Sequence, residues 1–323
     1  MADGTKIEWS DATWNVITGC SVVSPGCTSC YAMQLAGTRL QHHPSRAGLT
    51  KQSKAGPVWT GEVRFNEQWL DQPLRWSRPR RVFVCAHGDL FHEGAPDEWI
   101  DRAFAVMALA PQHTFQVLTK RPARMRAYLT SPSAYGRILA AAAPLRRARP
   151  QLGDIGIGNP ATSPMRWVWL GTSVEDQARA NQRVPILLDT PAAVRWISAE
   201  PLLGPVDLTN LDPTGIHRRM QTHGWSAIWK GNPIGRPWLD WVVIGGESGR
   251  EARMFDIRWG RDLISQCRAA NVPVFMKQMG TWPMAMKDKG AGPEPWPLAL
   301  DSRKGTDMAE WPEDLRIQEY PAP

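Results

Sequence analysis

Seven short apolar runs, rich in β-branched and aromatic residues, recur along this chain of 323 residues. They constrain the fold most, because helix-length amphipathic stretches separate several of them. Residues 97–109 open with acids and repeat apolar side chains at helical spacing, and residues 175–188 and 258–270 are amphipathic stretches of similar length. Buried strands that alternate with helices pair in parallel, which predicts an α/β fold. The predicted strands are 14–18, 81–86, 114–118, 167–170, 194–197, 241–244 and 273–276.

This succession of strand–helix units predicts a full or partial (β/α) barrel of the TIM type. An open doubly wound sheet is the other architecture that fits the same alternation. We expect the barrel to occupy residues 1–280, with insertions near 144–164 and 209–237 that interrupt the rhythm. Beyond the barrel, Pro and Trp become frequent and periodicity is weak. Residues 281–323 are therefore predicted to form an irregular tail that packs on the barrel.

Three of the five cysteines, Cys20, Cys27 and Cys30, lie within eleven positions in the loop 18–32, which follows the first predicted strand. An odd total and this crowding fit a metal site better than a disulfide framework. The two-residue gap between Cys27 and Cys30 lets two thiolates converge on one metal. The Pro-Gly pair before Cys27 supplies a turn that can bring in the third.

A ligand set of three thiolates, rather than four, favours an iron–sulfur cluster. A structural zinc site closes with a fourth Cys or His, and His42 and His43 lie twelve and thirteen residues beyond Cys30. A zinc site therefore remains an alternative, and so does a loop that binds no metal. Three thiolates on a 4Fe-4S cluster leave one iron for a substrate, which is a catalytic arrangement. Cys85 and Cys267 lie in apolar or helix-like segments and are predicted to be buried structural residues.

The segments around the loop resemble known families. Residues 27–32, Cys-Thr-Ser-Cys-Tyr-Ala, resemble the cluster loop of the radical S-adenosylmethionine superfamily, and the Cys-Tyr-Ala ending is similar to that of spore photoproduct lyase relatives. Over about residues 7–280 the chain closely resembles a phage and bacterial three-cysteine-motif family, long catalogued as a domain of unknown function. The segments that carry this resemblance are residues 8–31, which begin Glu-Trp-Ser-Asp-Ala-Thr-Trp-Asn, Asp-Leu-Phe-His at 89–92, Trp-Leu-Gly-Thr-Ser-Val-Glu at 169–175 and Gly-Gly-Glu-Ser at 245–248.

The superfamily resemblance implies a barrel of the radical S-adenosylmethionine kind, with Cys20, Cys27 and Cys30 as ligands of a 4Fe-4S cluster. S-adenosylmethionine then chelates the remaining iron, and an electron from an external one-electron reductant cleaves it to a 5'-deoxyadenosyl radical. The sequence departs from the superfamily pattern twice. The first cysteine gap holds six residues rather than three, and the Gly-Gly-Glu element at 245–247 follows about the sixth predicted strand rather than the second.

Polar side chains follow the ends of the predicted strands, where the active site of a parallel barrel lies. These residues are His87, Asp89, His92, Lys120, Ser173, Glu175, Ser198, Glu200, Glu247, Ser248, Lys277 and Gln278. We predict catalytic roles for Glu247, Lys120 and Asp89. We predict that the adenosyl ligand is bound by Gly245, Gly246, Glu247, Glu175, Ser173, Ser198, Glu200 and Tyr31. Plainer roles stay open, such as a helix cap for Asp89 and an ion-pair partner for Glu200.

The formal charge of +7 is unevenly distributed along the chain. Residues 38–81 hold nine Lys or Arg against three acids, and residues 112–153 hold eight basic residues and no acid. Such zones suit a phosphate backbone, although a solvated basic surface is the plain alternative. Together with the similarity to spore photoproduct lyase relatives, which implies a role in DNA repair, these zones lead us to expect a nucleic acid, in particular DNA, or a nucleotide as the substrate of base modification or lesion repair.

Two other functions fit the same sequence. One is a non-catalytic module in which zinc or a cluster stabilises a nucleic-acid-binding barrel that recruits a partner enzyme. The other is a radical enzyme for a small metabolite or peptide. No apolar run approaches the roughly 18 residues that span a bilayer, and residues 1–10 lack a basic leader with an apolar stretch, so we expect a cytoplasmic protein without a membrane partner.

Overall fold

Each predicted apolar run contains or overlaps a strand, and seven strands form one sheet. The computed structural model describes residues 4–152, 158–212, 225–229, 237–288 and 293–322. The strands of the sheet are β1 (Ala12–Trp14), β6 (Arg81–Val84), β7 (Thr114–Thr119), β8 (Val168–Ser173), β9 (Val194–Ala199), β10 (Trp241–Gly245) and β12 (Val274–Gln278).

The order of hydrogen-bonded strands distinguishes between the two predicted architectures. The order is β1-β6-β7-β8-β9-β10-β12, which follows the chain without reversal, and the pairs β1–β6, β6–β7, β9–β10 and β10–β12 are parallel. A doubly wound sheet reverses its strand order at a switch point, whereas a TIM barrel adds each strand beside the last. The α/β prediction is confirmed, and the sheet is compatible with a partial TIM-type barrel.

The predicted helices are present with small shifts at their ends. Helix α2 has the predicted bounds, and its two first-turn acids complement the positive end of the helix dipole. Helices α3 and α4 were not predicted: α3 has only 8 residues, and only Ala134, Ile138 and Ala142 of α4 are buried, so neither has a long apolar face. The helices are α1 (Tyr31–Gly37), α2 (Asp97–Leu109), α3 (Pro122–Leu129), α4 (Ala134–Ala148), α5 (Gln177–Leu188) and α7 (Ile257–Ala269). No described helix is long and apolar enough to cross a bilayer.

The chain divides into two units. The first comprises Met1–Ser24, Cys30–Gly171 and Asp189–Val194, and the second comprises Pro25–Ser29, Thr172–Leu188 and Arg195–Pro323. The cysteine loop is therefore shared: Cys20 and Cys30 belong to the first unit and Cys27 to the second. Strand β8 passes from the first unit into the second along its own length.

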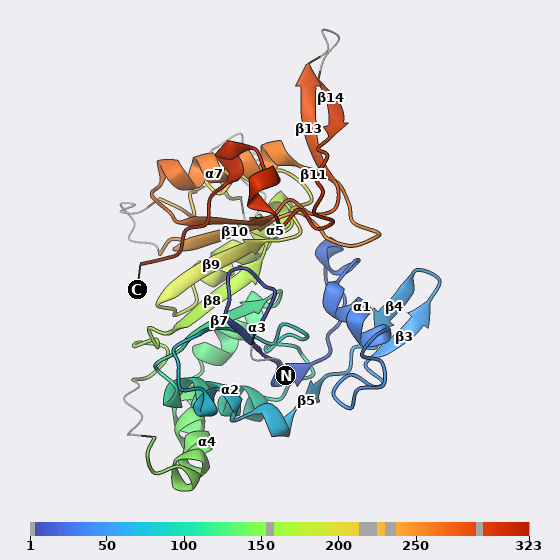
Figure 1. Cartoon of the computed structure of the whole chain (residues 1–323). Helices are drawn as coiled ribbons and strands as arrows, with labels where there is room; N and C mark the ends of the chain where they lie inside the picture. The colour runs from blue at the N-terminus through green and yellow to red at the C-terminus, as the bar shows by residue number, and fades with distance from the viewer. Residues whose placement is uncertain (1–3, 153–157, 213–224, 230–236, 289–292, 323) are drawn as a thin grey trace. The chain divides into compact units, whose positions relative to one another are not determined.

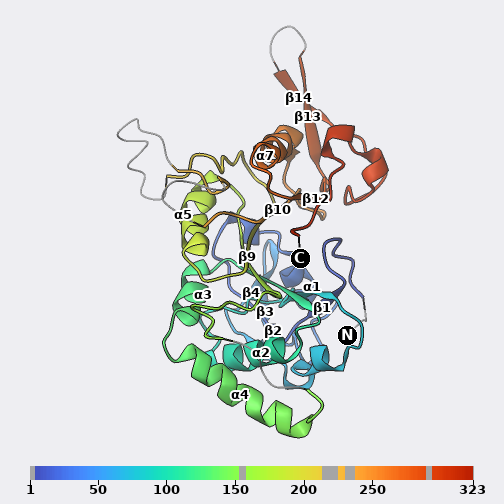
Figure 2. The same ribbon diagram turned by 90° about the vertical axis from the view of Figure 1, so that its left-hand side faces the viewer.

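The first unit carries the N-terminal strands of the sheet and α1 to α4. Helix α1 packs on an antiparallel hairpin of β3 (Thr50–Ser53) and β4 (Gly56–Trp59), as Figure 1 shows. Helices α2 and α4 pack side by side (Figures 1 and 2). The predicted strand 14–18 is split, because β2 (Ile17–Thr18) leaves the sheet and pairs with β5 (Arg64–Phe65).

The second unit contains a hairpin where the tail was predicted to be irregular. Strands β11 (Phe255–Asp256), β13 (Pro283–Asp288) and β14 (Pro293–Pro297) form a sheet in that order, and the β13–β14 hairpin projects from its unit (Figure 1). Strand β14 has proline at every second position. Because β14 is an edge strand, all three missing N–H groups can face away from β13, so the ladder survives.

The end of the tail packs on the sheet of the second unit. Met276 N donates to Ile317 O at 2.8 Å, and Trp241 Nε1 donates to Glu319 O at 2.8 Å. At the predicted insertion 144–164, helix α4 extends to Ala148 with Pro144 inside it. Residues 153–157 of that insertion, and 213–224 and 230–236 of the insertion 209–237, lie outside the described residues.

Candidate functional site

None of the five cysteines forms a disulfide, and three of them, Cys27, Cys85 and Cys267, are buried. Cys85 and Cys267 are buried, which confirms the predicted environment, and burial raises the pKa of both thiols to about 12. Cys20 and Cys30 are partly exposed and pack on one apolar cluster of the first unit, formed by Ala32, Met33, Ala36, Leu49 and Trp59. Within the described residues, no three His, Cys, Asp or Glu side chains are arranged to hold a metal ion.

Cys20 lies beside a buried guanidinium that the sequence did not reveal. Arg121 Nη1 donates to Cys20 Sγ at 3.6 Å and to Asp89 Oδ2 at 3.0 Å. Its Nε donates to Glu93 Oε2 and its Nη2 to Ser21 Oγ, both at 2.6 Å. Burial raises the pKa of the Cys20 thiol to about 12, and the Asp89 charge adds to the shift while Arg121 opposes it.

Asp89 uses its carboxylate to join two loops of the first unit. It accepts hydrogen bonds from Phe91 N, Thr119 Oγ1, Lys120 N and Arg121 Nη1, at 2.7 to 3.2 Å. Four donors occupy the lone pairs of a carboxylate, so Asp89 connects the segment after β6 to the end of β7. The predicted site residue Lys120 meets Asp89 through its backbone amide.

Two histidines after β6 lie against arginines. Arg46 Nη2 donates to His87 Nδ1 at 3.0 Å, and burial together with the Arg46 charge lowers the pKa of His87 to about 4. His92 Nε2 lies 3.0 Å from Ser21 Oγ, and burial followed by the Arg121 charge lowers its pKa as well. His87 is therefore neutral at pH 7.

Tyr31 begins helix α1 directly after Cys30, which is the N-cap residue. Its side chain is 48% exposed, and its hydroxyl donates to Ala86 O at 2.5 Å. The Tyr31 ring meets the His87 ring edge to face. Tyr31 thus connects the start of α1 to the loop after β6 within the first unit.

In the second unit, Glu175 holds the backbone of the segment that carries Cys27. The Glu175 side chain is 0% exposed, and its Oε1 accepts a hydrogen bond from Gly26 N at 3.2 Å. Its Oε2 accepts from Arg183 Nη1 at 2.9 Å. A Cβ on Gly26 would lie 3.1 Å from the Glu175 carboxyl, so the close approach favours glycine there.

Glu247 and Arg253 support the same segment from another side. Glu247 accepts from the Arg253 amide and Nε at 2.9 Å and from its Nη2 at 2.6 Å. Arg253 Nη1 then donates to Pro25 O at 2.9 Å. The hydrogen bonds to Glu247 are the first cause of the raised Arg253 pKa, and the charges of Glu175 and Cys27 contribute further.

The other predicted cofactor-binding residues also make contacts inside the second unit. A Cβ on Gly245 would lie 2.8 Å from the Glu200 side chain, and one on Gly246 would lie 2.2 Å from Met279 O. Both glycines are therefore needed for packing. Glu200 Oε1 accepts from Lys277 Nζ at 2.7 Å, which realises the ion-pair alternative for Glu200.

Ser173 and Ser198 are buried at the ends of β8 and β9. The Ser173 carbonyl accepts a hydrogen bond from Arg183 Nη1 at 2.9 Å, and the Ser198 carbonyl accepts from Val174 N at 2.8 Å. Their backbone groups therefore help to hold Glu175 and its neighbours.

The predicted site residues gather into two groups, one in each unit. The sequence did not predict the arginines that pair with these carboxylates. They are Arg121 in the first unit, and Arg183 and Arg253 in the second. A signal was present in the sequence. Arg183 follows Glu175 by eight residues and Arg253 follows Glu247 by six, and a buried carboxylate requires a partner close by.

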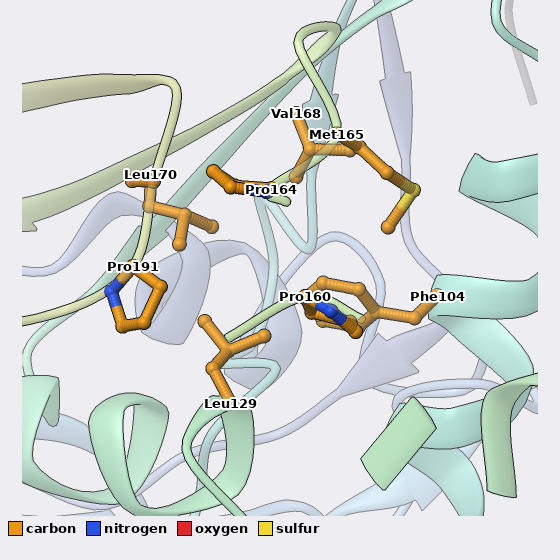
Figure 3. Close-up of a pocket in the computed structure, with 9 residues that line it drawn as sticks. Phe104, Leu129, Pro160, Pro164, Met165, Val168, Leu170 and Pro191 are labelled. Atoms are coloured by element: carbon orange, nitrogen blue, oxygen red, sulfur yellow. The ribbon is translucent and has the colours of Figure 1, made fainter. Parts of the chain in front are cut away.

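The first unit also contains a small pocket, shown in Figure 3. Its lining is apolar and includes Phe104, Leu129, Met165 and Leu170. None of the predicted site residues lines it. This pocket offers no group for acid, base or metal chemistry.

Comparisons with known proteins give one match. No curated protein and no solved structure matches the chain. The model of a family described as "Protein of unknown function (DUF5131)" matches residues 4–308, which is most of the chain. The chain therefore belongs to the DUF5131 family.

Proposed function

We propose that this protein is a radical S-adenosylmethionine enzyme that holds a 4Fe-4S cluster through Cys20, Cys27 and Cys30 and acts on a nucleic acid, in particular DNA, or on a nucleotide. The observation that carries the proposal is the crowding of three thiols into one eleven-residue segment, in which Cys20 and Cys30 are partly exposed and Cys27 is buried. When bound, the cluster would supply the one-electron reduction, from an external reductant, that breaks the carbon–sulfur bond of S-adenosylmethionine to give methionine and a 5'-deoxyadenosyl radical.

The chemistry of the donor set fits this group. Thiolates are the ligands that iron–sulfur clusters take, and three of them make the assembly anionic. Each unit places a guanidinium close to its part of the loop: Arg121 beside Cys20, and Arg253 within electrostatic range of Cys27. Cations around an anionic cluster favour its retention.

The chain's own residues hold the loop. Glu175 accepts from the N–H and Arg253 donates to the C=O of the Pro25–Gly26 peptide, and Ser29 Oγ donates to Glu251 O at 3.4 Å. A loop held through its backbone leaves its side chains to the ligand. Glu175 therefore positions the loop directly, and Glu247 positions it through Arg253.

The predicted catalytic roles of Asp89, Lys120 and Glu247 remain predictions. The carboxylate of Asp89 accepts four hydrogen bonds, and that of Glu247 accepts three, all from donors of the protein itself. Lys120 forms no ion pair among the described residues and is half-buried. Of the three, Lys120 is the side chain best able to meet a carboxylate or phosphate of a substrate.

A basic surface in the first unit supports the nucleic-acid substrate. Arg39 is exposed just after α1, Lys51 and Lys54 are exposed on the β3–β4 hairpin, and none of the three forms an ion pair within the described part of the chain. Helix α1 starts at Tyr31, next to Cys30. A phosphate backbone bound there would lie along the helix that the cysteine begins.

The test is anaerobic purification followed by iron and sulfide analysis and by an assay for 5'-deoxyadenosine with dithionite and S-adenosylmethionine. We expect bound iron and cosubstrate cleavage in the wild type. The variants C20A, C27A and C30A should lose both, whereas the matched controls C85A and C267A should retain iron.

Other outcomes overturn the proposal in distinguishable ways. Tight zinc binding without cosubstrate cleavage would favour the non-catalytic nucleic-acid-binding module. Cosubstrate cleavage without salt-sensitive DNA affinity would favour a small metabolite or peptide as substrate. Colourless protein that lacks iron after anaerobic preparation would exclude the cluster.

A further inference from the structure

Arg121 is buried in a network that ends on a thiol. Its side chain is 4% exposed, and it donates to Asp89, Glu93, Ser21 and Cys20. Burying a guanidinium is costly unless its charge is paired. The two carboxylates provide the pairing, yet one N–H of the same group is directed at a sulfur atom.

The network holds Arg121 in one orientation. Asp89 is itself buried and joined to Thr119 and Lys120, so it cannot move with the guanidinium. Arg121 N also donates to Thr119 Oγ1 at 2.9 Å. A donor held this rigidly keeps its hydrogen bond to Cys20 when the charge on the sulfur changes.

We propose that Arg121 is a positioning residue that raises the reduction potential of the cluster bound by Cys20, an inference that rests on the proposed function. Reduction adds one electron from the external reductant and one negative charge to the cluster, and no bond forms or breaks at Arg121. A hydrogen bond and a positive charge beside a ligand sulfur stabilise the more negative, reduced state.

Replacing Glu93 in the same network should shift the reduction potential in the opposite direction from replacing Arg121. Its side chain is 65% exposed, and its Oε2 accepts from Arg121 Nε. Replacing Glu93 with glutamine keeps an acceptor but removes the negative charge that offsets Arg121. The potential should therefore rise in E93Q and fall in R121Q. A merely structural role for Arg121 does not predict shifts in opposite directions.

The experiment is a redox titration of the anaerobic, cluster-loaded protein, monitored by the electron paramagnetic resonance signal of the reduced cluster. We expect R121Q to shift the reduction equilibrium at least about tenfold toward the oxidised state, or about 59 mV for a one-electron couple. R121K keeps the charge and should fall between R121Q and the wild type. The matched control is R124Q, which loses the same charge from an arginine paired with Asp97, and it should leave the potential unchanged.

The outcomes separate the two proposals. Wild-type protein without iron overturns the proposed function and this inference with it. A loaded wild type whose potential is the same in R121Q and E93Q overturns the inference alone. Should R121Q fail to retain the cluster, the comparison of E93Q, R121K and R124Q still decides, because equal potentials in E93Q and R124Q contradict the proposal.

Discussion

At the scale of single residues, buried charges in this protein serve mainly to hold other residues. Asp89, Glu175 and Glu247 each face an arginine at 2.6 to 3.0 Å, and each connects loop segments that follow different strands or carry a cysteine. Charge-assisted hydrogen bonds of this kind are short and directional. They orient the backbone around the thiols more strictly than apolar contacts would.

The pairing of His87 with Arg46 predicts a pH dependence of stability. The folded-state pKa of His87 is lowered to about 4 from 6.5. Between these values the unfolded chain binds more protons than the folded one, so stability is full above pH 6.5 and is lost as the pH falls toward 4. We expect a loss of about 2 kcal/mol from this group, measured by urea denaturation across that range.

The variant H87N retains an acceptor for Arg46 and removes the titrating group, so its stability should vary less between pH 6.5 and 4. The matched control is H42N, which changes an exposed histidine and should follow the wild-type curve. Parallel curves for the wild type and H87N would contradict the prediction.

At the scale of elements, the packing of helix α1 on the β3–β4 hairpin depends on one glycine. A Cβ on Gly37, the last residue of α1, would lie 2.1 Å from Pro57 Cβ. The neighbouring atom belongs to a rigid proline ring in β4, which cannot move aside alone. The close packing of helix and hairpin therefore requires glycine at this position.

Two Gly-to-Ala variants should change stability in opposite directions. G37A forces α1 and β4 apart and should lower the free energy of unfolding by about 1–3 kcal/mol. G136A lies inside helix α4 with open space around the added methyl, and it should raise the free energy of unfolding by up to about 1 kcal/mol. Urea denaturation of both variants checks this, and a change of the same sign in both would contradict it.

At the scale of the whole molecule, the net charge overstates the surface available to phosphates. At least four of the eight basic residues between 112 and 153 are paired with carboxylates in the described structure: Arg121, Arg124, Arg137 and Arg149. Their charge is offset before any ligand arrives. Arg39, Lys51 and Lys54 have no carboxylate partner among the described residues, so they are more available to phosphates than the total charge of +7 suggests.

Two double variants with the same change of net charge should therefore differ in DNA binding. K51Q/K54Q removes unpaired charges and should weaken binding about five- to tenfold and reduce the salt slope by about two. R75Q/R102Q removes arginines paired with Asp71 and Glu67 and should change the affinity less than twofold. Fluorescence anisotropy with labelled DNA across a salt series measures both, and equal weakening would show that only net charge matters.

Much of the fold could be predicted because the periodicity of a strand or helix is local. Acids at 97 and 98 followed by apolar spacing predict α2 with its observed bounds. The hairpin β13–β14 could not be predicted, because a proline-rich strand is stable only at the edge of a sheet, and which strand lies at the edge is a tertiary property.

The alternation of strands and helices, the crowding of three cysteines and the polar residues that end the strands are local features, so they could be read from the order of residues alone. Which charges meet depends on how the chain folds. Carboxylates predicted to bind a cofactor or to act in catalysis are held by arginines, because pairing depends on distances between separate segments, and a local pattern carries no information about those distances. The pairs that illustrate this are Arg121 with Asp89, Arg183 with Glu175, and Arg253 with Glu247.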